Sequence, residues 1–296
     1  MNCLFCNSTR INESYLPSTI YNNKKFDYLR CSNCSLIYLN PVPSDEDLIK
    51  MYPPSYQNGV DRSILNNPNQ KLIGLRYSYA KHFDLLRSIN FKGKMLDFGC
   101  GNAHFIINSN HHGFNCDGAE FNPRHVSVLN NEISESDFFS VDEFFQSELK
   151  YDLIRLSNVF EHFTNPINML NQIKSKLKEG GYLLIEGPIE TNFNFALVFR
   201  KIYFNLRKKL QPSWIVAHTP THIIFTNHKN QLDVFNCLGL STIHYELAEA
   251  EWPFPQSFSK AEGLISKLNV VIARTSMILK KLNKNWGNTF IYLGQN

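Results

Sequence analysis

From about residue 70 onward, short apolar runs alternate with segments whose apolar residues recur at helical spacing. Strands are expected at residues 94–98, 114–120, 137–140, 151–156, 182–186, 240–247 and 288–293, with a further short run at 223–225. Helices are expected at residues 70–89, 103–110, 123–131, 165–177, 195–210, 227–237 and 259–282, with Gly180 and Gly181 closing the fourth of them. This rhythm predicts an α/β fold with a Rossmann-like parallel sheet of about seven strands, whose ligands lie at the carboxyl ends of the strands.

The chain divides into three regions that differ in their pattern of cysteine, turn-forming and apolar residues. Residues 1–45 hold paired cysteines and two short strand-like runs, at 28–30 and 36–39. Residues 46–69 form a turn-rich linker that begins within a short helix, Asp45–Met51, which Ser44 is expected to cap. Residues 70–296 form the main domain, with a helical insertion at about 190–215, after the fifth strand.

Composition restricts the function classes only loosely. The 30 basic and 26 acidic side chains give a formal net charge of +4, which is too balanced to indicate a nucleic-acid partner. No run reaches the roughly 18 to 20 apolar residues that cross a bilayer. Cys3 and Cys6 stand where a signal peptide would need an apolar segment, so the cytoplasm is the expected location.

A glycine turn carries the strongest chemical signal. The predicted strand 94–98 delivers Asp97, and Gly99 and Gly101 then permit a tight turn and a close approach of backbone to a ligand. The helix that follows points its free amide groups at the same place. Glu120 ends the next strand, 19 residues after Gly101, where an acid can accept hydrogen bonds from ribose hydroxyls.

A dinucleotide-binding oxidoreductase is the main rival for this turn. Its fingerprint needs a third glycine where the helix packs on the strand and the pyrophosphate sits, and here that position is His104. The neighbouring carboxylate of Asp97 would also repel a pyrophosphate. A ligand with an amino group and a ribose therefore fits better.

Residues 94–190 resemble the class I S-adenosyl-L-methionine-dependent methyltransferases. The resemblance lies in the first motif at 96–103, the acid Glu120, the fourth-strand motif at 151–166 and the strand that begins at Gly180. It implies that Asp97, Gly99 and Gly101 hold the methionine moiety and that Asn158 lies beside it. It also implies that Phe121 flanks the adenine and that Glu120 binds the ribose.

The cysteines of residues 1–45 form two knuckles, and their members are Cys3 and Cys6, then Cys31 and Cys34. Two such pairs, separated by 24 residues, supply four thiolates for a tetrahedral zinc ion. Since no ligand position is left open, the predicted zinc is structural. The remaining cysteines stand alone and are expected to be buried apolar residues.

The segment Cys31–Ser44, followed by Tyr52 and Tyr56, is similar to the zinc-binding segment of bacterial methyltransferases that modify sugars. The match is closest to sugar-nucleotide C-methyltransferases and their relatives in surface-polysaccharide synthesis. Members of that type are longer and carry a further C-terminal domain. The resemblance therefore implies a sugar-containing acceptor, with methylation at oxygen at least as well supported as methylation at carbon.

Methylation of a hydroxyl needs positioning and a base whose pKa is near neutrality, and histidine is the usual supplier. His162 follows the fourth strand at the cofactor end of the sheet. His222 and His218 occupy a segment where methyltransferases that act on small molecules and sugars often place histidines that face the substrate. Of the two, His222 is the better candidate. Glu161 is a further candidate, expected to fix the loop. For His162 the alternative of a histidine that only orients a loop stays open.

Three other interpretations stay open. An RNA or protein methyltransferase could use the zinc module for recognition, although no basic cluster with interleaved aromatic residues surrounds the cysteines. A zinc-ribbon adaptor without activity is disfavoured by the intact glycine turn. The cationic amphipathic segment 195–210 is either a surface helix over the sheet or a lid or membrane-surface contact. The oligomeric state is left open.

Overall fold

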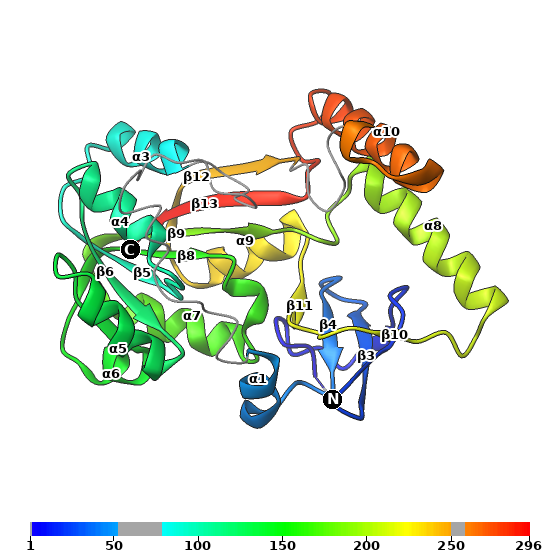
Figure 1. Cartoon of the computed structure of the whole chain (residues 1–296), viewed down its shortest axis with the longest axis horizontal. Coiled ribbons are helices and arrows are strands. Elements are labelled where there is room, and N and C mark those ends of the chain that lie inside the picture. Colours follow the sequence, from blue (N-terminus) through cyan, green and yellow to red (C-terminus); the bar gives the residue numbers. More distant parts are fainter. Residues whose placement is uncertain (1, 53–78, 250–257) are drawn as a thin grey trace.

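The structure is a computed structural model that describes residues 2–52, 79–249 and 258–296. Its central sheet has seven strands in the order β12–β13–β9–β8–β5–β6–β7 (Figure 1). The strands are β5 (Lys94–Phe98), β6 (Asn115–Glu120), β7 (Phe138–Ser140), β8 (Tyr151–Ser157), β9 (Leu177–Pro188), β12 (Ser241–Ala248) and β13 (Thr289–Gln295). The expected α/β sheet of seven strands is confirmed.

The sheet is mixed, whereas the sequence pattern predicted a parallel one. Strands β5 to β9 run parallel to one another, but β13 lies antiparallel between β9 and β12. A buried apolar run reads the same in either direction, so the pattern could not reveal this reversal.

Helices cover both faces of this sheet. One face carries α3 (Tyr79–Ser88), α4 (His104–His111) and α5 (Pro123–Glu132), and the other carries α6 (Val141–Gln146), α7 (Pro166–Ser175) and α9 (His228–Cys237). Successive strand residues alternate between the two cores. Met95 packs with the first group of helices and Leu96 with the second, as the two-residue repeat of a strand requires.

A second, smaller sheet is built from two distant parts of the chain. Its strands are β1 (Ile11–Glu13), β2 (Thr19–Tyr21), β3 (Lys24–Cys31), β4 (Ile37–Asn40), β10 (Val216–Ala217) and β11 (Ile224–Phe225). β10 pairs with β2, and β11 pairs with β4, so the segment that follows the fifth central strand completes the N-terminal module. The buried side chains of both parts form one continuous core.

Two longer helices lie outside the central sheet, at the right-hand end of the molecule in Figure 1. They are α8 (Phe195–Leu210) and α10 (Gly263–Lys280), and they pack against each other. The first is the helical insertion expected after the fifth strand.

Most predicted elements appear with small shifts in their ends. α1 (Asp45–Met51) has the expected bounds, because Ser44 and Asp47 form a reciprocal capping box at its start. The expected helix at 70–89 corresponds to α3, and its residues 70–78 lie outside the described residues. Gly180 and Gly181 were expected to close a helix. They lie instead inside β9, where the pairing with β8 shifts register.

Several short elements were not predicted. The helix α6 and the strands β1, β2 and β10 contain six residues or fewer, and three of them contain only two or three. Segments of that length hold less than two turns of helix or two repeats of a strand, so hydrophobic periodicity cannot reveal them.

Phe235 of α9 anchors the second face and gives a test of the fold. Its ring is fully buried and lies 4.3 Å from the ring of Tyr292 and 5.7 Å from that of Phe160. We expect Phe235→Ala to lower the free energy of unfolding by about 3–5 kcal/mol, because it leaves a cavity in the core. Urea denaturation measures this change. Leu264→Ala, at a side chain that is 86% exposed, is the control and should change it by less than about 0.5 kcal/mol; equal effects would contradict the packing.

Candidate active site and cysteine cluster

The glycine turn joins β5 to α4 at the carboxyl end of the parallel strands. Gly99 has φ +74° and Gly101 has φ +52°, a backbone region that favours glycine. A Cβ on Gly99 would lie 2.6 Å from Cγ2 of Val159, whereas a Cβ on Gly101 would meet nothing within 4 Å. Gly99 is therefore also required for the close approach of this turn to the loop after β8.

Glu120 ties the end of β6 to the same turn. Its Oε2 accepts the amide of Gly101 at 2.8 Å, and its Oε1 accepts the amides of Phe121 and Asn122 at 2.7 and 3.3 Å. These bonds hold the carboxylate beside the glycine turn, where the sequence placed a ribose contact. Phe121 is 51% exposed and packs edge-on against Phe98, so its ring stands at the outer side of the turn.

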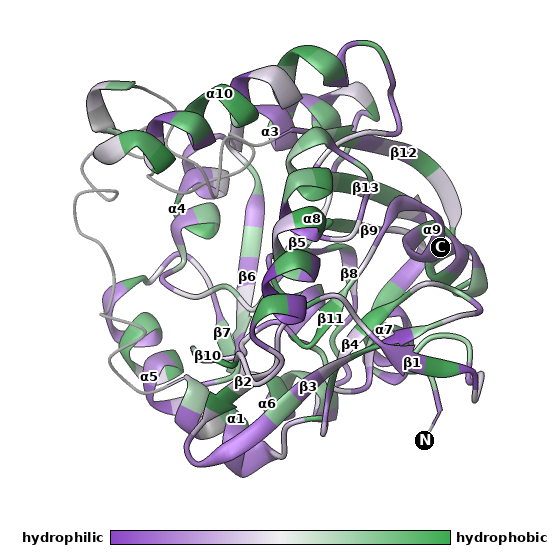
Figure 2. Ribbon diagram, turned by 90° about the vertical axis from the view of Figure 1, so that its right-hand side faces the viewer, coloured by the Kyte–Doolittle hydropathy of each residue, from purple (hydrophilic) through white to green (hydrophobic). Residues whose placement is uncertain are grey.

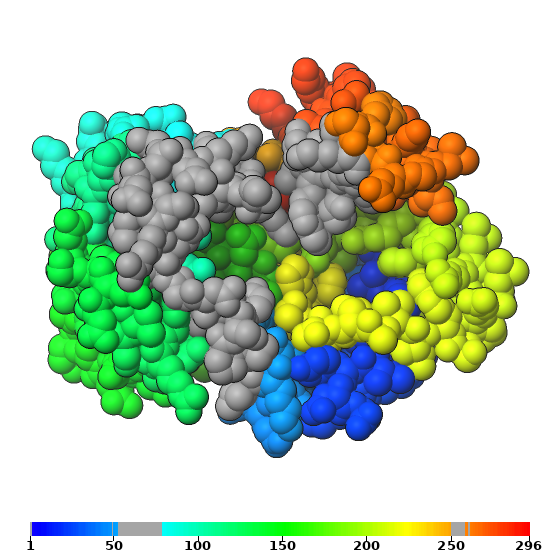
Figure 3. All heavy atoms as spheres, viewed as in Figure 1, coloured from blue at the N-terminus to red at the C-terminus, as the bar shows by residue number. Residues whose placement is uncertain are grey.

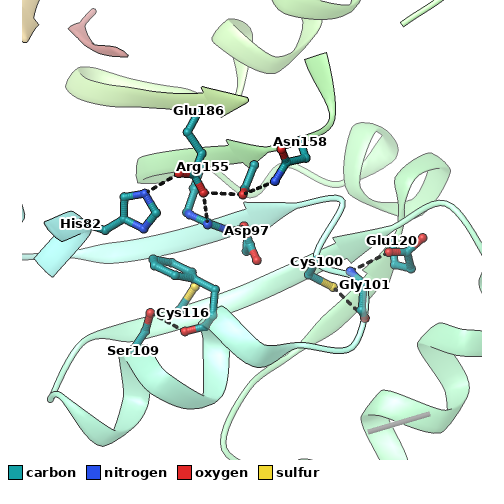
Figure 4. Close-up of polar contacts among 12 residues, drawn as sticks. His82, Asp97, Cys100, Gly101, Ser109, Cys116, Glu120, Arg155, Asn158 and Glu186 are labelled. Atoms are coloured by element: carbon teal, nitrogen blue, oxygen red, sulfur yellow. Dashed lines mark hydrogen bonds and ion pairs between the residues drawn. The ribbon is translucent and has the colours of Figure 1, made fainter. Parts of the chain in front are cut away.

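A buried ionic network crosses the sheet behind the turn (Figure 4). Arg155 of β8 donates to Asp97 of β5 at 2.7 Å and to Glu186 of β9 at 2.8 Å. His82 of α3 lies 3.0 Å from the other oxygen of Glu186. The guanidinium also stacks on the Phe105 ring, 3.9 Å from its centroid. Residues of five elements, β5, β8, β9, α3 and α4, thus meet around the charge of Arg155.

The two carboxylates of this network differ in their acidity. Burial raises the pKa of Asp97, and the guanidinium of Arg155 only partly opposes that rise. Burial would also raise the pKa of Glu186, but His82 and Arg155 outweigh it and hold the pKa at about 2. Glu186 is therefore the more acidic of the two carboxyl groups. The sequence reasoning missed Arg155, Glu186 and His82, although a charged residue inside an apolar strand was a usable signal for the first two.

A pocket opens between this network and the glycine turn. Its lining residues are Tyr79, Asp97, Gly99, Cys100, Asn102, His104, Phe105, Arg155 and Ser157. Two buried polar atoms in this lining, Nε of Arg155 and Oδ1 of Asn102, have no hydrogen-bond partner among the described residues. One is a donor and the other an acceptor, so a ligand that carries both a carboxylate and an ammonium group would satisfy both.

The three predicted catalytic residues come together in one cluster. Glu161 and His162 lie in η2 (Phe160–His162), directly after the loop that contacts Gly99, and His222 lies just before β11. The two imidazole centroids are 5.0 Å apart, and one ligand atom from each of the three residues lies within 4.8 Å of the others. Residues that are 60 positions apart in the chain thus form one cluster.

Hydrogen bonds orient both histidines of this cluster. Nδ1 of His162 lies 2.7 Å from the carbonyl oxygen of Thr221 and 2.7 Å from the hydroxyl of Tyr52. Because a carbonyl only accepts, Nδ1 carries the proton and Nε2 keeps its lone pair. Nδ1 of His222 lies 2.9 Å from a carboxylate oxygen of Glu190. Burial lowers the pKa of His162 below its usual 6.5, so the ring is neutral at pH 7.

Two further candidates occupy other positions. Asn158 has φ +53°, and its backbone N–H donates to the backbone carbonyl of Glu186 at 3.0 Å. This bond holds the residue in the turn after β8. His218 directly follows β10 of the small sheet, and its ring nitrogens face the hydroxyls of Thr19 and Tyr28 at 3.1 and 3.3 Å. The structure thus brings His162 and His222 together and leaves His218 in a different environment.

The four N-terminal cysteines also converge. Sγ of Cys3 is 3.5 Å from Sγ of Cys34, and Sγ of Cys6 is 3.6 Å from Sγ of Cys31. All four sulfur atoms lie within 4.8 Å of one another. A disulfide would need about 2.05 Å, whereas four thiolates at about 2.3 Å from a tetrahedral zinc ion lie about 3.8 Å apart. Amides of Phe5 and Asn33 point at two of the sulfurs.

Two features define a class I methyltransferase fold. One is the strand order of the central sheet, with one reversed strand next to its edge. The other is the glycine turn after β5, which is bonded to an acid at the end of the neighbouring strand. The chain belongs to the methyltransferase domain family, which matches residues 74–244. It is an S-adenosyl-L-methionine-dependent methyltransferase.

A solved structure agrees on the fold. A complex of the Trm112 methyltransferase activator of Haloferax volcanii with a methyltransferase is similar with a TM-score of 0.51 and 13% identity, covering 79% of this chain and 92% of that chain. An S-adenosyl-L-methionine-dependent methyltransferase from Archaeoglobus fulgidus is similar with a TM-score of 0.46 and 19% identity, covering 75% and 96%. No curated protein matches the sequence significantly.

The close approach at Gly99 gives a test of the cofactor site. We expect Gly99→Ala to weaken binding of S-adenosylhomocysteine at least tenfold, about 1.4 kcal/mol, because the methyl group collides with Val159 and displaces the turn. Titration calorimetry measures the affinity. Gly113→Ala is the matched control, since Gly113 also has a positive φ, +80°, but its Cβ would meet nothing within 4 Å. Equal losses in both variants would show that backbone strain, and not the contact with Val159, matters.

Proposed function

We propose that this enzyme methylates a hydroxyl group of a sugar or of a sugar-containing small molecule. The observation that carries the proposal is the cluster of Glu161, His162 and His222, which holds a neutral imidazole in the loop that touches the cofactor turn. The sugar class is supported by the resemblance of residues 31–44 to the zinc-binding segment of sugar methyltransferases.

The residues of the pocket fit the methionine end of the cofactor. Nε of Arg155 would donate to its carboxylate, while Oδ1 of Asn102 and the carboxylate of Asp97 would accept from its ammonium group. Glu120 accepts three backbone amides, and carboxylate oxygens have about four lone-pair sites, so it retains capacity for a ribose hydroxyl. When bound, S-adenosyl-L-methionine supplies an electrophilic methyl group on a positively charged sulfur.

His162 is the proposed general base. Thr221 fixes the tautomer in which Nε2 is free to take the proton of the acceptor hydroxyl. Oε1 of Glu161 lies 3.9 Å from Nε2 and would stabilise the imidazolium that forms. His222, held by Glu190, would orient the acceptor by a hydrogen bond from the other side of the cluster.

We also propose that the four-cysteine cluster binds one structural zinc ion. The sulfur separations match a tetrahedral site better than any disulfide, and the amide contacts to sulfur are those of a thiolate acceptor. The strand β4 follows the second cysteine pair and pairs with β11, which begins two residues after His222. The zinc would therefore stabilise the small sheet that supports His222.

A substitution of His162 tests the base. With nucleotide-linked sugars as a panel of acceptors, we expect His162→Gln to lower kcat by about 10²–10⁴ while the affinity for S-adenosylhomocysteine is unchanged. His228→Gln is the control, because His228 is also hydrogen-bonded through Nδ1, to Asn192, but lies on α9. A His162→Gln enzyme with normal kcat on an acceptor that the unsubstituted protein methylates would exclude His162 as the base.

The pH dependence follows from the same residue. The base works in its neutral form, so kcat/KM should rise as the pH increases through the pKa of His162 and then level off. Because burial lowers that pKa, the midpoint of this limb should fall below pH 6.5. A midpoint above 6.5 would mean that another group is titrating.

Metal analysis tests the zinc proposal. The purified protein should contain about one zinc per chain, and Cys34→Ser should lose it together with part of the thermal stability. Cys237→Ser is the matched control, since Cys237 is exposed and lies outside the cluster. A folded protein that never contains zinc would refute the proposal.

A further inference from the structure

The two outer helices expose an unusual amount of apolar surface. On α8, only Leu197 is buried, and the exposed large apolar side chains are Phe199, Ile202, Tyr203, Leu206 and Leu210, with 44% to 81% of their surface accessible. On a helix that merely covers a sheet, such residues would face the core.

α10 continues this surface. Its exposed apolar side chains are Leu264, Ile265, Leu268, Val271, Met277 and Ile278, and Leu264 reaches 86%. The two helices contact each other where α10 lies against the upper end of α8 (Figure 3), and Figure 2 shows hydrophobic stretches on both of them. Together they carry about half of the large apolar side chains that are exposed on the described residues. A patch of this kind marks an interaction site.

The charge of these helices restricts the partner. α8 contains Arg200, Lys201, Arg207, Lys208 and Lys209, and α10 contains Lys267, Arg274 and Lys280, whereas neither helix contains an aspartate or a glutamate. The whole chain, by contrast, is nearly balanced. A second copy of this surface would bring like charges together, which opposes self-association. An anionic surface would be attracted.

Several of these cations already have neutral partners. Arg200 donates to the carbonyl of Glu190 at 2.6 Å, and Lys208 donates to the carbonyl of Ser14 at 2.9 Å. The guanidinium of Arg207 lies 4.3 Å from the centroid of the Trp214 ring. Such contacts fix these side chains without neutralising their charge, although Glu13 and Asp27 also act on Lys208.

We propose that α8 and α10 together form a docking surface for an anionic lipid bilayer. Apolar side chains would enter the boundary between headgroups and acyl chains, and exposed cations such as Lys209 and Lys267 would face the phosphates. Tyr203 and Trp214, whose rings are 6.3 Å apart, supply the amphipathic aromatic groups that favour that boundary. The helices would lie in the plane of the membrane, since within the described residues no helix is long and apolar enough to cross one.

The docking surface is connected to the catalytic cluster. Glu190 accepts from Arg200 of α8 through its carbonyl and holds His222 through its carboxylate. An acceptor that is itself held at a membrane would therefore arrive close to His162 and His222. This consequence rests on the proposed function, whereas lipid binding does not.

Vesicle sedimentation tests the proposal. Full-length protein should sediment with vesicles of phosphatidylcholine and phosphatidylglycerol, far less with phosphatidylcholine alone, and less again at high salt. We expect the quadruple variant Leu206→Ser, Leu210→Ser, Leu264→Ser and Ile265→Ser to reduce binding at least about tenfold, because exposed apolar groups drive insertion.

The matched control is Leu149→Ser with Ile243→Ser, whose side chains are 43% and 45% exposed outside these helices, and it should bind like the unsubstituted protein. Affinity for S-adenosylhomocysteine should be normal in both variants, which separates a failure of this proposal from a failure of the proposed function. No binding to anionic vesicles would overturn the proposal. The proposal would also be overturned if light scattering showed the unsubstituted protein to be a dimer and the quadruple variant a monomer, since the surface would then join two copies.

Discussion

The guanidinium of Arg155 lies at the centre of the sheet, and the arrangement of the site depends on how that charge is compensated. A buried charge is costly unless it is paired, and loss of one partner of such a pair costs about 3–5 kcal/mol. Asp97 and Glu186 provide the compensation from the two neighbouring strands, and His82 extends it to α3. Three parallel strands and one helix are thereby fixed where the pocket beside the glycine turn opens, and the same arginine lines that pocket.

A second constraint acts through the backbone of the loop before β11. The amide of Ile223 donates to the carbonyl of Glu161 at 2.8 Å, and the amide of Leu39 donates to the carbonyl of Ile223 at 2.9 Å. η2, the segment before β11 and the N-terminal sheet are therefore joined by consecutive backbone hydrogen bonds. The N-terminal module is not an appendage to the methyltransferase domain, because these bonds connect it to the turn that holds Glu161 and His162.

Much of the central fold could be predicted because its determinants are local. Buried strands and amphipathic helices longer than about two turns show their period directly, and Ser44 and Asp47 show the start of α1. The glycine turn and Glu120 were found because backbone freedom and a carboxylate at a set distance are visible in the chain. Elements of two or three residues, such as β10 and β1, were missed because they are stabilised by their partners and not by their own pattern.

The sequence by itself determined the class of the fold, the place of the glycine turn and the four thiols of the N-terminal cluster, since each is encoded by residues close together or by a fixed spacing. Only the tertiary structure decided that Asp97 pairs with Arg155, that Glu161 and His162 meet His222, and that α8 joins α10 in one cationic, apolar surface. These are contacts between distant segments, and their partners are selected by packing and by the compensation of buried charge, which no local pattern contains.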